Sequence, residues 1–291
     1  MHTLAPKPSA SLPNFSRLFV KGRYPPTAPL HLCHSDIEAS DGAGGALLLC
    51  CGTRQTYLNI LTEYNDEWLN THGGRGRIAH NLSQIRVMYP PTLVHLQLII
   101  SLLRPNIVQT SDIRIALDPP PSLIVLVDPS TLLGTESPPT ISSFLLIVAE
   151  TVACLNFLNS GKSSRSPRLA IFDRQFDELE FVVSPSPQPD DDEQADRASQ
   201  SEDSQGDSAE PLIHQYFDWV GTVREIHTER PDEPIVQPDK FQTLELTLQP
   251  AGRGEAGATS LDPLVYLWEL EIGEENALTR RSGLKATFTR Q

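Results

Sequence analysis

The loop at residues 51–56 has the setting of a phosphate-binding loop but lacks its key residues. It reads Cys-Gly-Thr-Arg-Gln-Thr and lies between a short apolar run and a segment with helical spacing. Such strand–turn–helix connections bind phosphate through backbone N–H groups and the helix N-terminus. An ATPase loop also needs a lysine followed by serine or threonine, and this loop has no such pair. The candidate nucleotide-binding residues are those of a degenerate loop: Gly52, Thr53, Arg54, Gln55 and Thr56.

A carboxylate, Asp128, ends a second apolar run at residues 122–127. Nucleotide-binding folds place a Mg²⁺ ligand at the end of such a strand, and an aspartate there can equally cap the following turn. Arg54 leaves a similar choice open, between a phosphate contact and a structural turn. Because no catalytic constellation accompanies these residues, we predict no catalytic residue and no cofactor, with bound ATP and Mg²⁺ as the alternative.

The remaining chemistry-bearing residues form no recognisable site. His31, Cys33 and His34 have metal-ligating side chains, but no second ligand pair at zinc-site spacing accompanies them, so no metal site is predicted. Four cysteines in 291 residues, two of them adjacent, do not make a disulfide framework and indicate a reducing compartment.

The formal net charge of −14 argues against a protein that coats nucleic acid with its whole surface. However, residues 186–210 alone hold nine acidic residues and one arginine, which is −8 of this total. Local DNA binding elsewhere therefore stays open. The candidate contacts are basic residues near the C-terminus, for which a solvated tail is the alternative: Arg280, Arg281, Lys285 and Arg290.

Apolar runs and helical spacing alternate along the chain and predict an α/β fold. Strands are expected at 46–51, 84–89, 122–127 and 168–172, with helices between them. Runs that are apolar on both faces are typical of parallel strands covered by helices on each side. We therefore predict a mostly parallel sheet flanked by helices.

Composition divides the chain into five parts. Residues 1–42 are rich in Pro and Ser and are predicted to be a disordered arm, and 43–185 form the α/β core. Residues 186–210 lack any apolar residue larger than Ala and are predicted to be a disordered acidic insertion. Residues 211–273 supply C-terminal edge strands to the same core, and 274–291 form a basic tail.

Two helices, at 93–103 and 144–158, are more apolar than surface helices need to be. Packing on both faces of the sheet is the preferred explanation, and cover by a partner chain is the alternative. The second helix is shorter than the roughly 20 residues that cross a bilayer and carries Glu150. With no secretory signal at the start, the chain is expected to be soluble and intracellular, without a membrane partner.

Four segments, in this order, resemble the RecA-like recombinase paralogs of eukaryotic homologous recombination. They are the strand at 46–53, the segment LSQIRVMYPPT at 82–92, the strand PSLIVLVD at 121–128, and the helix at 144–158 followed by RLAIF at 168–172. Within this family the chain is most similar to the ATPase-like subunits of Shu-type complexes, which associate with a SWIM-domain zinc protein. The resemblance spans roughly residues 44–272 and implies a RecA-like P-loop NTPase core with a degenerate phosphate loop.

The resemblance implies a non-catalytic or weakly ATPase-active accessory role in homologous recombination DNA repair. A chain of this kind would pair with a SWIM-domain protein, assist a RecA-family recombinase on single-stranded DNA, and work in the nucleus. Since the Gly-Lys-Thr sequence that family members often keep is missing, ATP hydrolysis is not carried over. The alternatives are an active ATPase of the RecA-like class and a RecA-like subunit of another assembly, such as the Elongator ring.

Overall fold

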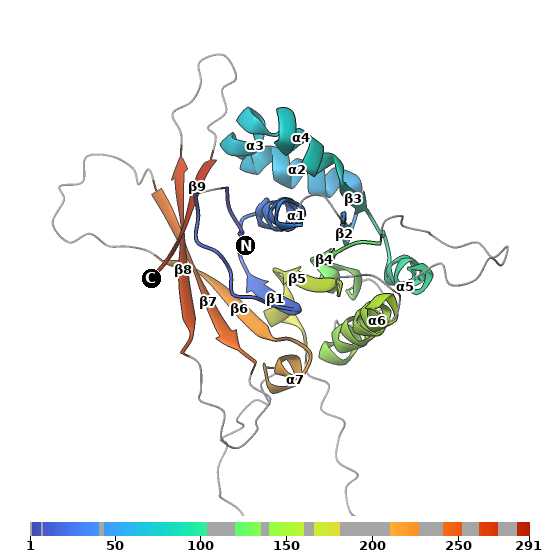
Figure 1. Cartoon of the computed structure of the whole chain (residues 1–291). Coiled ribbons are helices and arrows are strands. Elements are labelled where there is room, and N and C mark those ends of the chain that lie inside the picture. The colour runs from blue at the N-terminus through green and yellow to red at the C-terminus, as the bar shows by residue number, and fades with distance from the viewer. Residues whose placement is uncertain are drawn as a thin grey trace, which may run out of the picture.

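The computed structural model contains one mixed sheet of nine strands in the order β3-β2-β4-β5-β1-β6-β7-β8-β9 (Figure 1). It describes residues 2–6, 8–40, 44–103, 120–134, 140–159, 166–180, 210–226, 241–251, 262–272 and 284–291. The strands are β1 (Arg17–Gly22), β2 (Ala46–Cys50), β3 (Ile85–Met88), β4 (Leu123–Val127), β5 (Arg168–Asp173), β6 (Trp219–Ile226), β7 (Phe241–Pro250), β8 (Leu264–Ile272) and β9 (Leu284–Arg290).

The first six strands of the spatial order run parallel, and the last three pairings are antiparallel. Strands β2 and β4 are buried at every position, which is why their sequences are continuous apolar runs. The predicted α/β class, with a mostly parallel sheet flanked by helices, is confirmed. The predicted strands at 46–51, 84–89, 122–127 and 168–172 correspond to β2, β3, β4 and β5.

Helices cover both faces of the sheet. On one face lie α1 (Ala28–Ala39), α2 (Arg54–Tyr64), α3 (Glu67–His72) and α4 (Gly76–Ser83), and α5 (Leu93–Leu102), α6 (Ile141–Asn159) and α7 (Glu210–His214) lie on the other. Alternate strand residues pack into two separate cores, so that Leu48 meets the α1 side and Leu49 meets the α5–α6 side. Short 3-10 turns follow β4 (Pro129–Leu132) and β5 (Phe176–Glu178).

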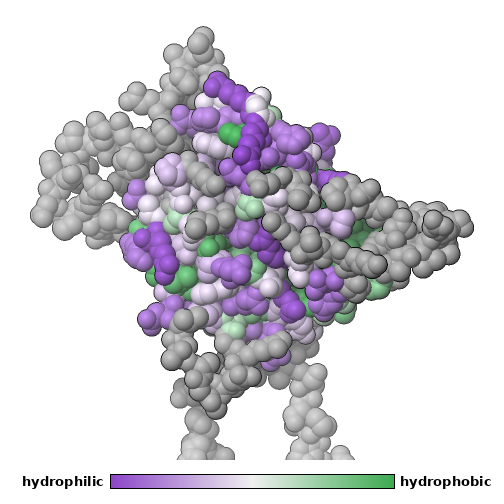
Figure 2. Space-filling view, viewed as in Figure 1, coloured by the Kyte–Doolittle hydropathy of each residue, from purple (hydrophilic) through white to green (hydrophobic). Residues whose placement is uncertain are grey.

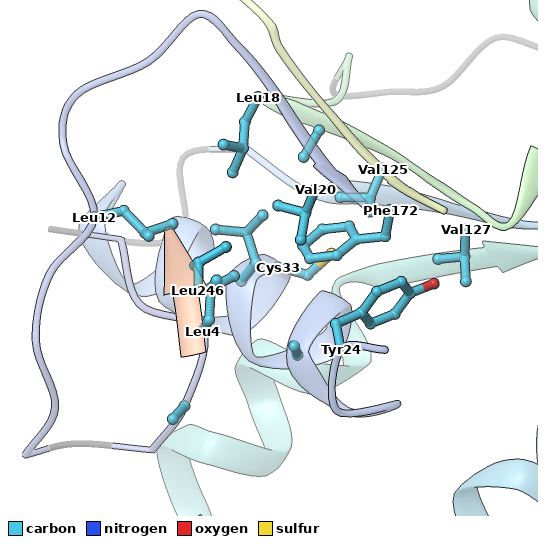
Figure 3. Close-up of a cluster of buried hydrophobic side chains, with 14 of the residues drawn as sticks. Leu4, Leu12, Leu18, Val20, Tyr24, Cys33, Val125, Val127, Phe172 and Leu246 are labelled. Atoms are coloured by element: carbon cyan, nitrogen blue, oxygen red, sulfur yellow. The ribbon is translucent and has the colours of Figure 1, made fainter. Parts of the chain in front are cut away.

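The prediction of a disordered arm at 1–42 is wrong. Strand β1 lies between β5 and β6 near the middle of the sheet and pairs in parallel with both. Ahead of it, Leu4 and Leu12 are buried in the same core as Leu246 of β7 (Figure 3), and Phe15 belongs to that core as well. The Pro and Ser content reflects an irregular backbone over these residues, whose apolar side chains nevertheless enter the core.

A buried ion pair helps to hold α1 against the sheet. Asp36 of α1 is fully buried and pairs with Arg168, the first residue of β5. The hydroxyl of Ser122, just ahead of β4, donates to the second oxygen of Asp36 at 2.7 Å. His2 lies beside this pair, and burial together with the charge of Arg168 lowers its pKa to about 4.

Strands β6, β7 and β8 extend the sheet within residues 211–273, where C-terminal edge strands are predicted, and β9 adds a further strand beyond them. Inward residues of β7 and β8 alternate with outward ones, and Leu246, Tyr266 and Trp268 are fully buried. Strand β9 occupies part of the segment at 274–291, so the prediction that this segment is a tail is wrong for residues 284–290. The acidic insertion lies almost wholly outside the described residues, and Glu210 at its end begins α7.

Helix α6 has 19 residues, four more than the predicted apolar helix at 144–158. By length and composition alone, it is the described helix that could cross a membrane. Its Phe144, Ile147 and Val148 are buried against the sheet, and core helices of soluble proteins meet the same criterion.

Candidate functional site

The loops that follow β2 and β4 meet at the carboxyl edge of the sheet. The connection from β2 leads outward to β3, whereas that from β4 leads the other way to β5, and ligands of open α/β sheets bind where the strand order reverses in this manner. The Cys51 amide donates to the Val127 carbonyl at 2.9 Å, and the Thr131 hydroxyl lies 3.2 Å from the Cys51 carbonyl oxygen. The structure thus brings the predicted loop at 51–56 and Asp128 to one edge.

The predicted loop residues mainly cap a helix. Gly52 has φ +126°, a conformation that favours glycine, and lets the chain turn from β2 into α2. The Thr53 hydroxyl accepts the Thr56 amide at 3.1 Å as the cap of α2, and Gln55 donates to Asn59 within the same helix. Arg54 is exposed at the first turn. The hydrogen bonds of Thr53 and Gln55 are therefore made within α2 and its cap.

Asp128 is held by two residues that the sequence did not single out. The Tyr24 hydroxyl donates to Oδ1 at 2.8 Å, and the Arg174 amide donates to the same oxygen at 3.1 Å. The Arg174 guanidinium binds Oδ2 at 3.2 Å. Asp128 itself has φ 51° and ψ 51°, a left-handed conformation that aspartate tolerates better than most residues. Both carboxylate oxygens are therefore engaged by the chain's own donors.

Tyr24 comes from the connection between β1 and α1, a second strand–loop–helix at this edge. Gly22 at the end of β1 has φ +97°, and its carbonyl accepts the Tyr24 amide at 2.9 Å. The Tyr24 ring is buried beside Phe172 (Figure 3), and the two ring centroids lie 5.1 Å apart. The Arg174 guanidinium stacks on the Tyr24 ring, 4.6 Å from its centre. Burial and the neighbouring Asp128 raise the Tyr24 pKa well above 10, so the phenol stays protonated and remains a donor.

A second carboxyl, Asp173, ends β5 beside this cluster and fastens the adjoining turns. It is fully buried and accepts the Ser130 amide at 2.9 Å, the Ser130 hydroxyl at 2.7 Å and the Gln175 amide at 2.9 Å. Burial raises its pKa to about 6, although the hydrogen bonds from Ser130 act in the opposite direction. This arrangement stabilises the turn after β4 that presents Asp128.

The cation at the end of β1 is paired with an acid. Lys21 is buried, and its ammonium lies 3.0 Å from the Asp177 carboxylate and 5.8 Å from the centre of the Phe176 ring. These contacts place it with the aromatic side chains of the α6 face, whereas Tyr24 belongs to the core on the α1 face.

The residues at this edge do not fit an ATP–Mg²⁺ complex. The loop at 23–27 reads Arg-Tyr-Pro-Pro-Thr, and its two prolines have no N–H to offer a phosphate. Neither this loop nor that at 51–56 has the lysine and following hydroxyl residue that bind phosphates and the metal. Asp128, the one predicted metal ligand, already accepts from Tyr24 and Arg174.

The histidines of α1 that have metal-ligating side chains, His31 and His34, pack against residues of the neighbouring helix α3 and its cap. His31 Nε2 lies 3.0 Å from the Asp66 carboxylate, to which the Thr27 hydroxyl donates at 2.7 Å. Both His31 and His34 pack edge-on against the Trp68 ring. Within the described ranges, three or more His, Cys, Asp or Glu side chains nowhere gather as a metal site would require.

Two of the four predicted DNA contacts lie within the described residues. Arg280 and Arg281 lie outside the described residues. Lys285 and Arg290 belong to β9, where they pair in register with Glu271 and Tyr266 of β8. Arg290 is exposed at the outer end of the sheet.

The fold and this edge together define an α/β protein in which the loops at 23–27 and 51–56 lack the lysine and following Ser or Thr of an ATPase phosphate-binding loop. No family model matches the chain, and the search of curated proteins found no match. Among solved structures, the chain is similar to the crystal structure of flagellar accessory protein FlaH from Methanocaldococcus jannaschii. The identity is 9%, the alignment covers 93% of this chain and 88% of that chain, and the TM-score is 0.39, so the likeness is confined to general architecture.

Proposed function

We propose that the chain is a non-catalytic, RecA-like accessory subunit in homologous recombination DNA repair. It would pair with a SWIM-domain zinc protein and assist a RecA-family recombinase on single-stranded DNA in the nucleus. The observation that carries the non-catalytic part is the engagement of Asp128 by Tyr24 and Arg174. The resemblance of the segments that form β2, β3, β4, α6 and β5 supports the recombination part.

Hydrolysis of ATP depends on positive charge against the phosphates and on a carboxylate that is free for the metal. At this edge, both cations form ion pairs within the chain: the Arg174 guanidinium with Asp128, and the Lys21 ammonium with Asp177. A metal ion bound to Asp128 would compete with the charge-assisted hydrogen bond that the Tyr24 hydroxyl donates to it. Such a bond contributes about 1.5–3 kcal/mol.

ATP turnover by the purified full chain tests the non-catalytic part. We expect no ATP–Mg²⁺ binding by calorimetry and no phosphate release above that of an Asp128→Ala control. Turnover that Asp128→Ala abolishes would instead establish an active RecA-like hydrolase.

Co-expression with the SWIM-domain protein from the same organism tests the partner. We expect a stoichiometric heterodimer by native mass spectrometry. Absence of a stable complex would contradict the pairing, and hexameric rings would point to another RecA-like assembly.

Single-stranded DNA binding is tested by fluorescence anisotropy on this complex at several salt concentrations. Because DNA affinity arises largely from released counterions, we expect it to fall steeply as salt rises. Arg290→Glu should weaken binding, whereas Arg224→Glu, an exposed arginine of β6, is the matched control.

A further inference from the structure

Helices α5 and α6 leave an apolar groove on the surface. Val94 and Leu98 of α5 are 71% and 53% exposed, and Phe157 of α6 is 43% exposed. With Ala153 and Cys154, these side chains line a cavity of about 700 Å³. Figure 2 shows apolar surface in the region where Figure 1 places α5 and α6. The inward side chains of both helices, Cys154 among them, already fill the sheet core, so the exposed Val94 and Leu98 of α5 are in excess of what the core requires.

One carboxylate lies within this apolar lining. Glu150 of α6 accepts the Gln97 side-chain amide through Oε1 at 3.2 Å, which links α6 to α5. Its other oxygen, Oε2, is buried and makes no hydrogen bond within the described part of the chain. A buried acceptor without a donor costs about 1–3 kcal/mol, and more when it is charged. The groove therefore combines exposed apolar side chains with an unsatisfied negative acceptor.

We infer that the α5–α6 groove binds an amphipathic helix of a partner protein, and that an arginine or lysine on that helix pairs with Glu150. Apolar anchors at i, i+3, i+4 and i+7 of such a helix would pack against Val94, Leu98 and Phe157. A basic side chain among them would bury its aliphatic stem on these residues and donate to Glu150 Oε2. The inference rests on the proposed function, because it assigns the face through which the accessory subunit would bind its partner.

The carboxylate also favours this occupant over others. In a symmetric dimer through this face, the same patch would meet itself and bring two Glu150 side chains together without a cation. An anionic lipid surface would likewise place negative charge against Glu150.

Photo-crosslinking in the native cell tests the occupant directly. The full chain carries a photo-reactive amino acid at position 98, and an identical substitution at position 58 is the control, because Leu58 is 37% exposed on α2, outside the groove. Mass spectrometry identifies the crosslinked segment. We expect an amphipathic helical segment of another protein, with a basic residue between apolar ones, from position 98 and not from position 58.

Crosslinks from position 98 only to this chain, to a second copy of it, or to an extended segment would overturn the inference. A suitable helix from a protein without a SWIM domain would support the groove and contradict the proposed partner. A SWIM-domain complex that forms without a crosslink from position 98 would support the proposed partner and contradict binding at the groove.

Two substitutions then measure the contributions to affinity for the partner so identified. Leu98→Glu should abolish binding, and Glu150→Gln should weaken it by at least about tenfold, because a buried charge pair loses its anion. Leu58→Glu should leave the affinity unchanged. Unchanged affinity for both groove variants, with thermal melts equal to the unmodified chain, would also overturn the inference.

Discussion

Replacing Tyr24 by phenylalanine removes the hydroxyl that engages Asp128 and little else. The ring is 3% exposed, and its packing on Phe172 and under Arg174 is unchanged by the substitution. The lost bond is 2.8 Å long and charge-assisted, and bonds of this kind contribute about 1.5–3 kcal/mol. Because Asp128 keeps its two bonds from Arg174, we expect Tyr24→Phe to lower the free energy of unfolding by about 2 kcal/mol.

A double-mutant cycle with Asp128→Asn isolates this interaction. Asparagine keeps an acceptor for Tyr24 and tolerates the left-handed backbone at this position, whereas alanine would add about 1–2 kcal/mol of backbone strain. In the Asp128→Asn background, Tyr24→Phe should cost only about 1 kcal/mol, the value of a neutral hydrogen bond. The coupling free energy between the two positions is then about 1 kcal/mol.

Urea denaturation followed by tryptophan fluorescence measures all four proteins, with Trp268 as a probe in the core. The slope of free energy against urea should be the same in each, since the fold is unchanged. A loss below about 0.5 kcal/mol for Tyr24→Phe, or zero coupling with Asp128→Asn, would refute the engagement of Asp128 by the phenol.

Three further predictions concern the sheet around this edge. The pKa of Asp173 is raised to about 6 in the folded chain, so its contribution to the free energy of unfolding is fully present below about pH 4 and is lost as pH rises through 6. Urea titrations at pH 4, 5, 6 and 7 should show the free energy of unfolding fall by up to about 3 kcal/mol. Gly22→Ala would place its Cβ 2.4 Å from the Val223 carbonyl oxygen at a positive φ, so thermal melts should show a loss of at least about 2 kcal/mol. Arg168→Leu leaves Asp36 buried without its cation, and chemical denaturation should show a loss of about 3–5 kcal/mol.

The strands that sequence could predict are those whose apolar character is continuous. Every residue of β2 and β4 is buried, and no polar position interrupts their runs. Strand β1 was missed because its four central buried residues end in Lys21 and follow a stretch rich in Pro and Ser. Such a run is too short for periodicity to reveal, and its place between β5 and β6 is fixed by pairing across more than a hundred residues of sequence.

The site was predicted in part for the same reason. Asp128 was identifiable because it ends an apolar strand, and Gly52 because it separates a strand from a helix. Tyr24 and Arg174 were not, since the contact of Asp128 with Tyr24 joins residues 104 positions apart. The available signal was local: Gly22 after the apolar residues of β1, followed by two prolines and a helix, repeats the strand–glycine–helix pattern that led to residues 51–56.

The carboxyl edge around Asp128 and the α5–α6 groove should respond differently to ligands. A ligand shifts a conformational equilibrium only by its difference in affinity between the two states. At the carboxyl edge, Tyr24 and Arg174 already donate to both oxygens of Asp128, so the proposed non-catalytic role predicts no stabilisation by nucleotide there. At the α5–α6 groove, by contrast, Glu150 Oε2 has no hydrogen-bond donor among the described residues, and the proposed partner helix would supply one. Complex formation by this chain is therefore expected to raise its thermal stability, and ATP added at millimolar concentration is expected to leave that stability unchanged.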